Sequence, residues 1–133
     1  MFRHDQHDED LALRLDQLMV AVLMADERER LDGLRARLSP DFVYVGPDAV
    51  FDGADGLSEA FARYRHDRGL GADLRRTSPV DQHHDWFRCT WARMERGRTA
   101  VEGWAFGSLD DGGAIRRLVV FEGLQPGRRA GND

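Results

Sequence analysis

Apolar and polar positions follow two different periods along this chain, a helical one in the first half and an alternating one in the second. Apolar residues recur at three- and four-residue spacing near the start: Leu11, Leu15, Leu18, Met19 and Val22. This spacing gives one apolar stripe and predicts a helix from about Glu9 to Ala25. Asp26 can cap a second helix, whose apolar residues continue until Pro40 stops it.

A short β-type region and a third helix follow. Residues 41–45 are aromatic and β-branched, a Gly-Pro-Asp sequence makes a turn, and 49–51 predicts a brief return strand. Asp55 can cap the third helix, and Gly69 and Gly71 end it. The apolar stripe of this helix is Leu57, Phe61 and Tyr64.

From residue 74 to the end, the pattern is that of strands. We predict strands over about 74–80, 86–94, 99–109 and 114–123, with turns between them. Pro79 places the first of these strands at a sheet edge or a bulge, because proline has no N–H to donate. Helices gathered before a run of antiparallel strands predict an α+β fold. We expect a curved antiparallel sheet that the three helices of the N-terminal half wrap into a cone.

Length and composition limit the class of protein. A chain of 133 residues predicts one domain, which we place at 9–125, with disordered tails at 1–8 and 126–133. The net charge of -5 argues against nucleic acid as a partner, and no apolar run is long enough to span a membrane. All 19 basic residues are arginine, which excludes Schiff-base lysine chemistry and a P-loop.

Cysteine usage and the start of the chain bear on the compartment. Cys89 is the single cysteine, so an internal disulfide is impossible and a reducing environment is favoured. The first ten residues are polar and acidic, and they lack the basic start and apolar stretch of a secretory signal. We therefore expect a cytoplasmic protein. Cys89 alternates with Phe87 and Trp91, which favours inert packing over nucleophilic chemistry.

Three stretches of the chain carry a family resemblance: LSPDFVYVGPDAVFDGADGLSEAFARY, VDQHHDWFRCTW and DDGGAIRRLVVFEGL. They resemble the nuclear transport factor 2-like (NTF2-like) superfamily, nearest its SnoaL-like and ketosteroid-isomerase-like group, over roughly residues 11–124. The resemblance implies a conical α+β half-barrel, an apolar cavity and frequent dimerisation through the open sheet face. Members of this superfamily include isomerases, dehydratases, cyclases, hydrolases and plain binders.

The acid–base residues that the resemblance would imply are replaced in this chain. The carboxylate expected just before the proline that ends the first strand is Gly46, which precedes Pro47. The acid expected in the Gly-x-Asp of a later strand is Ala105, and the tyrosine of the first helix falls near Met19. These departures argue against enolisation by that particular set, because no base is left to take the proton.

Three other residues are candidates for chemistry. The Tyr44 hydroxyl could donate to a carbonyl or a developing oxyanion, or bond to backbone as a core tyrosine. His83 and Asp85 could form a pair in which the acid orients an imidazole as general base, and only one of His83 and His84 can point inward. The alternative, which we favour because periodicity fails there, is that 81–85 is a solvated hairpin turn.

Alternation assigns the remaining apolar side chains to two faces of the sheet. The expected pocket lining is Met19, Phe42, Tyr44, Phe61, Tyr64, Phe87, Cys89 and Trp91. The expected outer face is Trp86, Thr90, Trp104, Phe106, Leu118 and Val120. A monomer rarely exposes so many contiguous apolar groups, which predicts an isologous homodimer through this face.

The sequence therefore predicts a protein that binds a small apolar or aromatic molecule in a cone-shaped cavity. Acid–base chemistry on that molecule, by Tyr44 with His83 or Asp85, is one hypothesis. The alternative is a non-catalytic ligand-binding, dimerisation or interaction domain, because the acidic positions of the family are Gly46 and Ala105 here. No cofactor is expected, and no ligand spacing indicates a metal site. The deciding feature is whether an ionisable side chain faces the cavity.

Overall fold

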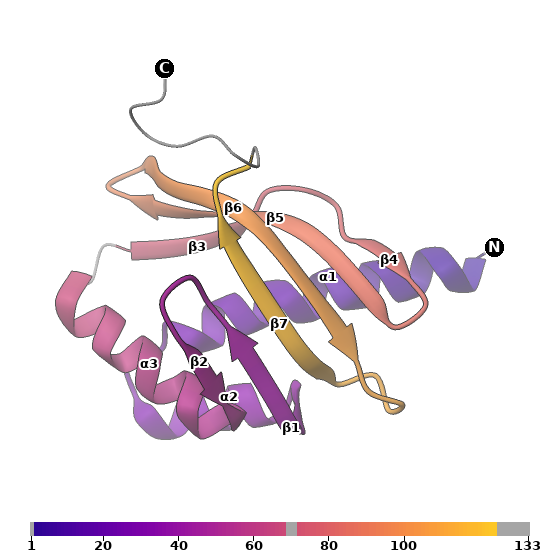
Figure 1. Ribbon diagram of the computed structural model, residues 1–133, viewed down its shortest axis with the longest axis horizontal. Coiled ribbons are helices and arrows are strands. Elements are labelled where there is room, and N and C mark those ends of the chain that lie inside the picture. The colour runs from indigo at the N-terminus through magenta and orange to yellow at the C-terminus, as the bar shows by residue number, and fades with distance from the viewer. Residues whose placement is uncertain (1, 69–71, 125–133) are drawn as a thin grey trace.

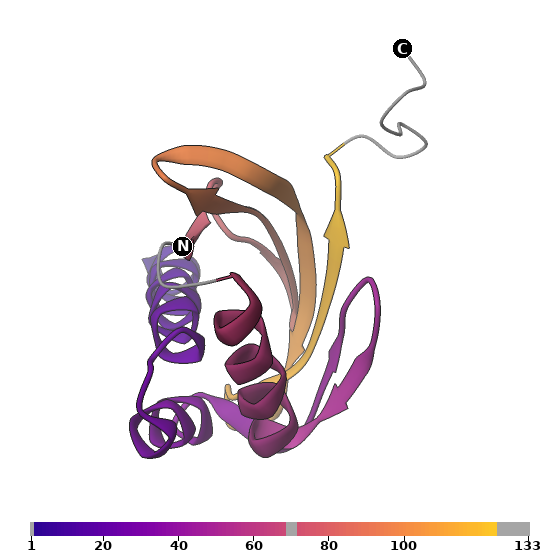
Figure 2. The same ribbon diagram turned by 90° about the vertical axis from the view of Figure 1, so that its left-hand side faces the viewer.

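The computed structural model describes residues 2–68 and 72–124, in which three helices lie against one face of a curved seven-stranded sheet (Figure 1). The helices are α1 (Phe2–Val22), α2 (Glu27–Arg35) and α3 (Gly53–Arg68). The strands are β1 (Leu38–Val45), β2 (Val50–Asp52), β3 (Ala72–Arg76), β4 (Asp81–His83), β5 (Trp86–Glu95), β6 (Arg98–Leu109) and β7 (Ile115–Glu122). Figure 2 shows the sheet curling over the helices, so the predicted α+β cone is confirmed.

The first helix forms where its apolar stripe predicts it, but it starts earlier. α1 begins at Phe2 rather than near Glu9. Residues 2–8, which we expected to be a tail, contain no glycine or proline that would interrupt a helix. The apolar stripe of α1 is buried as predicted, at Leu11, Leu15, Leu18 and Val22.

The second helix has the predicted start and a different end. Asp26 caps α2, because its Oδ2 accepts a hydrogen bond of 2.9 Å from the backbone N–H of Glu29. The helix ends at Arg35, so Pro40 does not stop it. Pro40 instead lies within β1, in a stretch where the ladder with β7 is irregular and a missing N–H is tolerated.

The sheet is mixed rather than wholly antiparallel. Its strand order is β2-β1-β7-β6-β5-β3, and β4 also pairs with β5. Among the described strands, β1 and β7 run parallel and all other pairs are antiparallel. The prediction of an antiparallel sheet is therefore wrong in this one pair. No hairpin joins β1 to β7, and the long chain between them can return in either direction, so local patterns give no sign of it.

The predicted strand 74–80 is shorter in the structure, where only residues 74–76 of it belong to a strand. β3 ends at Arg76 and β4 begins at Asp81, and both strands pair with β5 on its edge side. Pro79 lies in the break between them. Its placement agrees with the edge or bulge expected of a residue that cannot donate to a ladder.

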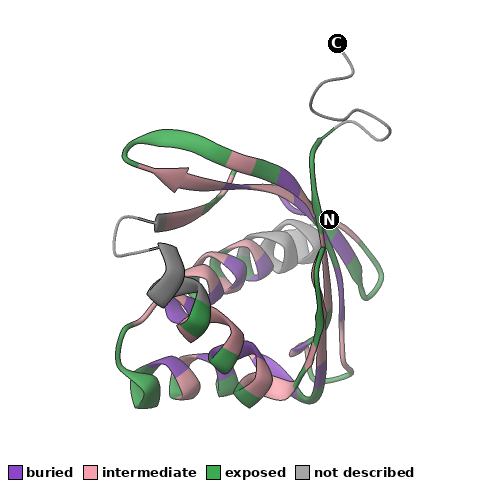
Figure 3. Ribbon diagram, turned by 60° about the vertical axis from the view of Figure 1, so that its left-hand side comes forward, coloured by how far each residue is buried: buried purple, intermediate pink, exposed green. Residues whose placement is uncertain are grey.

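The core lies between the helices and the concave face of the sheet. Its most deeply buried side chains are Leu11, Leu34, Phe42, Leu57, Cys89 and Ile115. They come from all three helices and from β1, β5 and β7, and Figure 3 shows buried positions on the helices and on the strands. No helix in the described part of the chain is long and apolar enough to cross a membrane.

Candidate functional site

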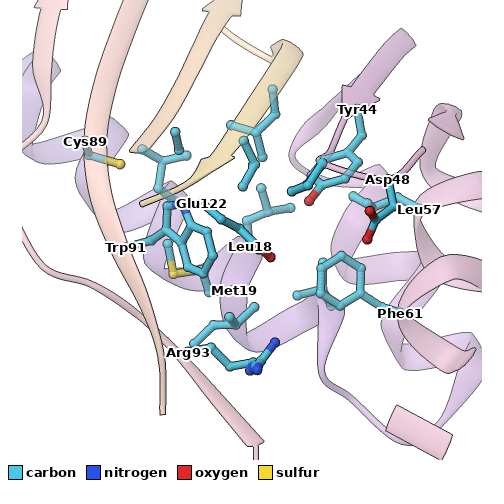
Figure 4. Close-up of a pocket in the computed structure, with 17 residues that line it drawn as sticks. Leu18, Met19, Tyr44, Asp48, Leu57, Phe61, Cys89, Trp91, Arg93 and Glu122 are labelled. Carbon is cyan, nitrogen blue, oxygen red and sulfur yellow. The ribbon is translucent and has the colours of Figure 1, made fainter. Parts of the chain in front are cut away.

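A cavity of about 260 Å³ lies between the helices and the concave face of the sheet. Its apolar and sulfur-bearing lining is Leu15, Leu18, Met19, Val22, Pro47, Leu57, Phe61, Leu74, Cys89, Trp91, Ala105, Leu118 and Val120. The other lining residues are Tyr44, Asp48, Arg93 and Glu122, which Figure 4 labels. A mostly apolar wall with a few polar groups is typical of small-molecule sites.

β6 presents small residues to the inside of the sheet, and one of them, Ala105, lines the cavity. Gly103, Ala105 and Gly107 lie on its inward face, directly opposite Trp91, Cys89 and Phe87 of β5. A Cβ at position 107 would lie 2.3 Å from Phe87 Cζ, and one at position 103 would lie 1.8 Å from the carbonyl oxygen of Phe121. No side chain fits at either position. The Phe87 ring and the backbone of β7 occupy the space that side chains at these two positions would need.

Tyr44 is the polar group that its surroundings fix most closely. β1 carries it between β2 and β7, where it pairs with Phe51 and Leu118. Between ring centres, Tyr44 stacks on Phe51 at 6.1 Å and meets Phe61 edge-on at 6.5 Å. A Cβ at Gly46 would lie only 2.8 Å from Tyr44 Cε1. The ring of Tyr44 thus fills the space that a side chain at position 46 would need.

The Tyr44 hydroxyl is a neutral hydrogen-bond donor at physiological pH. Burial raises the pKa of Tyr44 to about 12, and the negative charge of Glu122 contributes to the rise. Within the described residues, no partner takes a hydrogen bond from this hydroxyl. An oxygen atom of a ligand in the cavity can therefore accept its proton in a hydrogen bond.

Three charged residues of the lining were missed by sequence reasoning: Asp48, Arg93 and Glu122. Arg93 continues the inward alternation of Cys89 and Trp91 on β5, so the alternation of this strand predicts that Arg93 lines the cavity. Glu122 lies on the inward face of β7. Asp48 lies in the turn between β1 and β2, where no regular alternation predicts which way a side chain points. An ionisable side chain does face the cavity.

Most of the predicted pocket residues line the cavity: Met19, Tyr44, Phe61, Cys89 and Trp91. Phe42 and Phe87 do not line it. The helices pack directly on the part of the sheet that carries these two residues, so both side chains are buried in the core. The side chain of Tyr64 lies outside the described residues. Burial raises the pKa of the Cys89 thiol to about 11, which agrees with inert packing.

The polar stretch 81–85 lies apart from the cavity. It forms the hairpin of β4 and β5, with His84 at the turn in a left-handed conformation (φ 57°). The His83 side chain is 81% exposed, and its Nε2 lies 3.5 Å from Asp81 Oδ1. The structure thus places His83 and Asp85 where they do not contact a ligand in the cavity, because only later residues of β5 reach it.

The same hairpin does not form a metal site. Within residues 2–68 and 72–124, no three His, Cys, Asp or Glu side chains lie close enough together to hold a metal ion. The Asp81 carboxylate instead accepts a hydrogen bond of 3.0 Å from Arg88 Nε on the neighbouring strand. The turn is shorter than predicted, because residues 81–83 form β4 and only His84 and Asp85 make the turn.

The convex face of the sheet carries an outer aromatic cluster, formed by Trp86, Trp104, Phe106 and Phe121. Between ring centres, Trp104 stacks on Phe106 at 5.9 Å, and Phe106 meets Phe121 edge-on at 5.8 Å. Trp86 remains 60% exposed and Phe121 53% exposed. The helices cover the other face of the sheet (Figure 2), so Trp86, Phe106 and Phe121 stay open to solvent, and Trp104 is half-buried.

Two residues expected on that face lie on the other. Leu118 and Val120 line the cavity, so the outward residue of β7 is Phe121. The ladder between β6 and β7 shifts next to Leu109. Such a shift inverts the faces of the strand that follows, and the turn sequence alone does not reveal it.

Several solved structures share this fold. A proposed isomerase of the SnoaL-like family from Agrobacterium tumefaciens matches with a TM-score of 0.76 and 20% identity, over 84% of this chain and 95% of that one. An NTF2-like protein of unknown function from Cytophaga hutchinsonii matches with a TM-score of 0.61 and 15% identity, over 87% and 89%. A de novo designed protein with a curved β-sheet matches with a TM-score of 0.60 and 14% identity, over 89% and 87%. No family model and no curated protein matches the sequence.

These likenesses confirm the predicted resemblance at the level of the fold, which is that of SnoaL-like and NTF2-like proteins. They do not carry an activity across. A designed chain reaches the same architecture, which shows that the fold can exist without any inherited function. Function has to be argued from the residues of the cavity.

Proposed function

We propose that this chain, which has the cone fold of SnoaL-like and NTF2-like proteins, binds a small ring compound that carries an oxygen acceptor. The observation that supports the proposal is an apolar cavity with the neutral Tyr44 hydroxyl in its wall. An engineered protein cavity of about 150 Å³ binds benzene, so the cavity of about 260 Å³ accommodates one ring with substituents. Burial of the ring supplies affinity, and the hydroxyl fixes its orientation.

Acetophenone tests this proposal, because it combines one aromatic ring with one carbonyl oxygen. We expect calorimetry to detect binding, and the melting temperature to rise with the concentration of acetophenone. Tyr44→Phe should weaken acetophenone by about 2- to 13-fold, the value of one hydrogen bond. Ethylbenzene lacks the oxygen, so its affinity should not change in this variant. Binding of neither probe to the wild-type chain at millimolar concentration would overturn the proposal.

A second candidate function, proton transfer on the bound compound, is favoured by the carboxylates of Asp48 and Glu122 in the lining. Either carboxylate could take a proton from the carbon next to the carbonyl of a ligand. The electron pair of that C–H bond then forms an enolate, whose oxygen accepts a hydrogen bond from Tyr44. Return of the proton to a different carbon completes an isomerisation, without the acids that Gly46 and Ala105 replace.

The conversion of cyclohex-3-enone to cyclohex-2-enone, followed by ultraviolet absorbance of the conjugated product, tests this second candidate. We expect the wild-type chain to exceed the buffer rate, and the loss of the acting carboxylate in Asp48→Asn or Glu122→Gln to lower the rate by roughly 10²-fold or more. Tyr44→Phe should also lower it. If no rate exceeds that of buffer while acetophenone still binds, the chain is a non-catalytic binder.

We also propose that the outer aromatic cluster forms the interface of a homodimer. Three of its rings contact one another, and covering the exposed rings with a second copy would remove apolar surface from water. Sedimentation at micromolar concentration should show a dimer, and Phe121→Asp should convert it to a folded monomer, because the charge would be buried without a partner. A wild-type monomer under the same conditions would contradict the proposal.

A further inference from the structure

We propose that the ligand of the cavity is a ring compound with a carboxylate, and that Arg93 holds this carboxylate. The inference rests on the proposed binding function and names the class of its ligand. Arg93 lies on β5 two residues beyond Trp91, on the same inward face, and lines the cavity. Figure 4 shows Arg93 and Trp91 on one side of the cavity and Tyr44 and Phe61 on the other. A ring between these walls meets a polar group at each end.

The surroundings of Arg93 make its charge effective. In the ladders, Arg93 lies between two apolar residues, Leu74 of β3 and Val101 of β6, and its side chain is only 13% exposed. A charge that is shielded from water interacts more strongly than one at the open surface. The hydrogen bonds of a guanidinium to a carboxylate are also about twice as strong as those between neutral groups.

A contact with a protein carboxylate does not prevent this role. Arg93 Nε lies 3.8 Å from Glu95 Oε1 on the same strand. A guanidinium has five N–H donors in a fixed plane, so it can contact Glu95 and a ligand together. Glu95 then helps to hold the guanidinium in place, which reduces the entropy lost when the ligand binds.

Two other carboxylates of the lining repel an anion, and their positions decide how it lies. Asp48 and Glu122 are exposed residues, so water and salt screen their charges more than that of Arg93. The charge of Glu122 also acts on Tyr44, whose pKa it helps to raise. A ligand therefore places its carboxylate at Arg93 and its uncharged oxygen at Tyr44.

A matched pair of probes separates the effect of charge from that of shape. 4-Acetylbenzoate carries a carboxylate at one end of the ring and a carbonyl at the other, and 4-acetylbenzamide replaces the carboxylate with a neutral amide of similar size. We expect calorimetry to show that the wild-type chain prefers the acid by about tenfold or more. Arg93→Gln should abolish the preference, because it weakens the acid much more than the amide. Arg93→Lys should retain part of it, because the charge is kept and the planar fork is lost.

The outcomes distinguish this inference from the proposal on which it rests. If acetophenone and the amide bind but the wild-type chain shows no preference for the acid, Arg93 is not an anion anchor and the binding function stands. The same conclusion follows if Arg93→Gln keeps the full preference. If none of the three compounds binds, the binding function itself is wrong. If a variant fails to fold, the absence of a preference for the acid in the wild-type chain still overturns the inference.

Discussion

The two faces of β6 show how one strand can serve a hollow and a surface together. Its inward positions are Gly103, Ala105 and Gly107, and its outward positions between them are Trp104 and Phe106. The inner face has no side chain at positions 103 and 107, where the Phe87 ring and the backbone of β7 lie close to β6, and its Ala105 lines the cavity. The outer face carries large rings that contact one another and remain open to solvent.

The apolar residues of the two faces have different roles. Residues on the inner face lose contact with water when the chain folds, so they stabilise the monomer. Rings on the outer face keep much of their exposure, so their apolar surface contributes fully only when another surface covers them. Equal side chains on the two faces should therefore differ strongly in what they contribute to folding.

The largest expected effect comes from removing the same side chain on either face. Phe42→Ala should lower the free energy of unfolding by about 3–5 kcal/mol, because Phe42 is only 1% exposed and its loss leaves a cavity. Phe121→Ala is the matched control. Phe121 is 53% exposed, and we expect its loss to cost about 1 kcal/mol or less. Urea denaturation at a low protein concentration measures both, and equal losses would show that the two faces contribute alike to folding.

A methyl group added to the inward face of β6 should lower the free energy of unfolding by nearly as much. In Gly103→Ala the new Cβ would lie 1.8 Å from the carbonyl oxygen of Phe121, so β6 and β7 would have to separate. We expect a loss of about 3 kcal/mol in the free energy of unfolding. Gly112→Ala is the control, because its Cβ would meet nothing closer than 3.5 Å, at Asp110 Oδ1. If Gly103→Ala is tolerated, β6 and β7 are not closely packed at this position.

The loss of stability at alkaline pH should show how far Tyr44, on the inner face, is shielded from water. Below pH 10 Tyr44 is protonated in both states, and its contribution to stability is fully present. Between pH 10 and about 12 the unfolded chain releases this proton while the folded chain retains it, so stability falls. The total loss is of order 2 kcal/mol, at roughly 1 kcal/mol per pH unit.

Denaturation of the wild-type chain and of Tyr44→Phe, at chosen pH values of about 8, 10 and 11, measures this loss. The difference between the two proteins isolates Tyr44 from Cys89, whose pKa of about 11 adds a loss of the same sign. Parallel stability curves for the two proteins would show that Tyr44 is solvated.

Much of the fold could be predicted because its signals are local. The apolar stripe of α1, the cap at Asp26 and the alternation of β5 each depend on residues a few positions apart. The direction of β7 beside β1 and the phase of β7 depend on distant contacts and on a ladder shift. Leu118 and Val120 were therefore assigned to the wrong face, although their apolar character was read correctly.

The site could be predicted only where alternation was unbroken. Cys89 and Trp91 were placed in the lining because they belong to a regular strand, and Arg93 follows in the same phase. His83 and Asp85 were considered for their chemical type, which says nothing about position, and they lie at the exposed hairpin instead. The chemical type of a side chain is thus weak evidence that the residue lines a cavity, unless strand alternation also places it on the inward face.

The smallest expected effect concerns one methyl group beside the Tyr44 ring. In Gly46→Ala the new Cβ would lie 2.8 Å from Tyr44 Cε1 and 3.3 Å from its hydroxyl oxygen. Phe51 and Phe61 hold the other sides of the ring, so the ring or the turn must shift. We expect a loss of about 1 kcal/mol in stability, and an affinity for acetophenone close to that of Tyr44→Phe.

A double-mutant cycle shows whether Gly46 acts through Tyr44. If the methyl group only displaces the hydroxyl, Gly46→Ala should weaken acetophenone in the wild-type chain and change little in Tyr44→Phe, where no hydroxyl remains to be displaced. Equal effects in both backgrounds would mean that the added methyl acts on the cavity wall in general. The first result would explain why this chain has glycine before Pro47, because the inner face then holds a tyrosine hydroxyl where the resemblance implies a carboxylate.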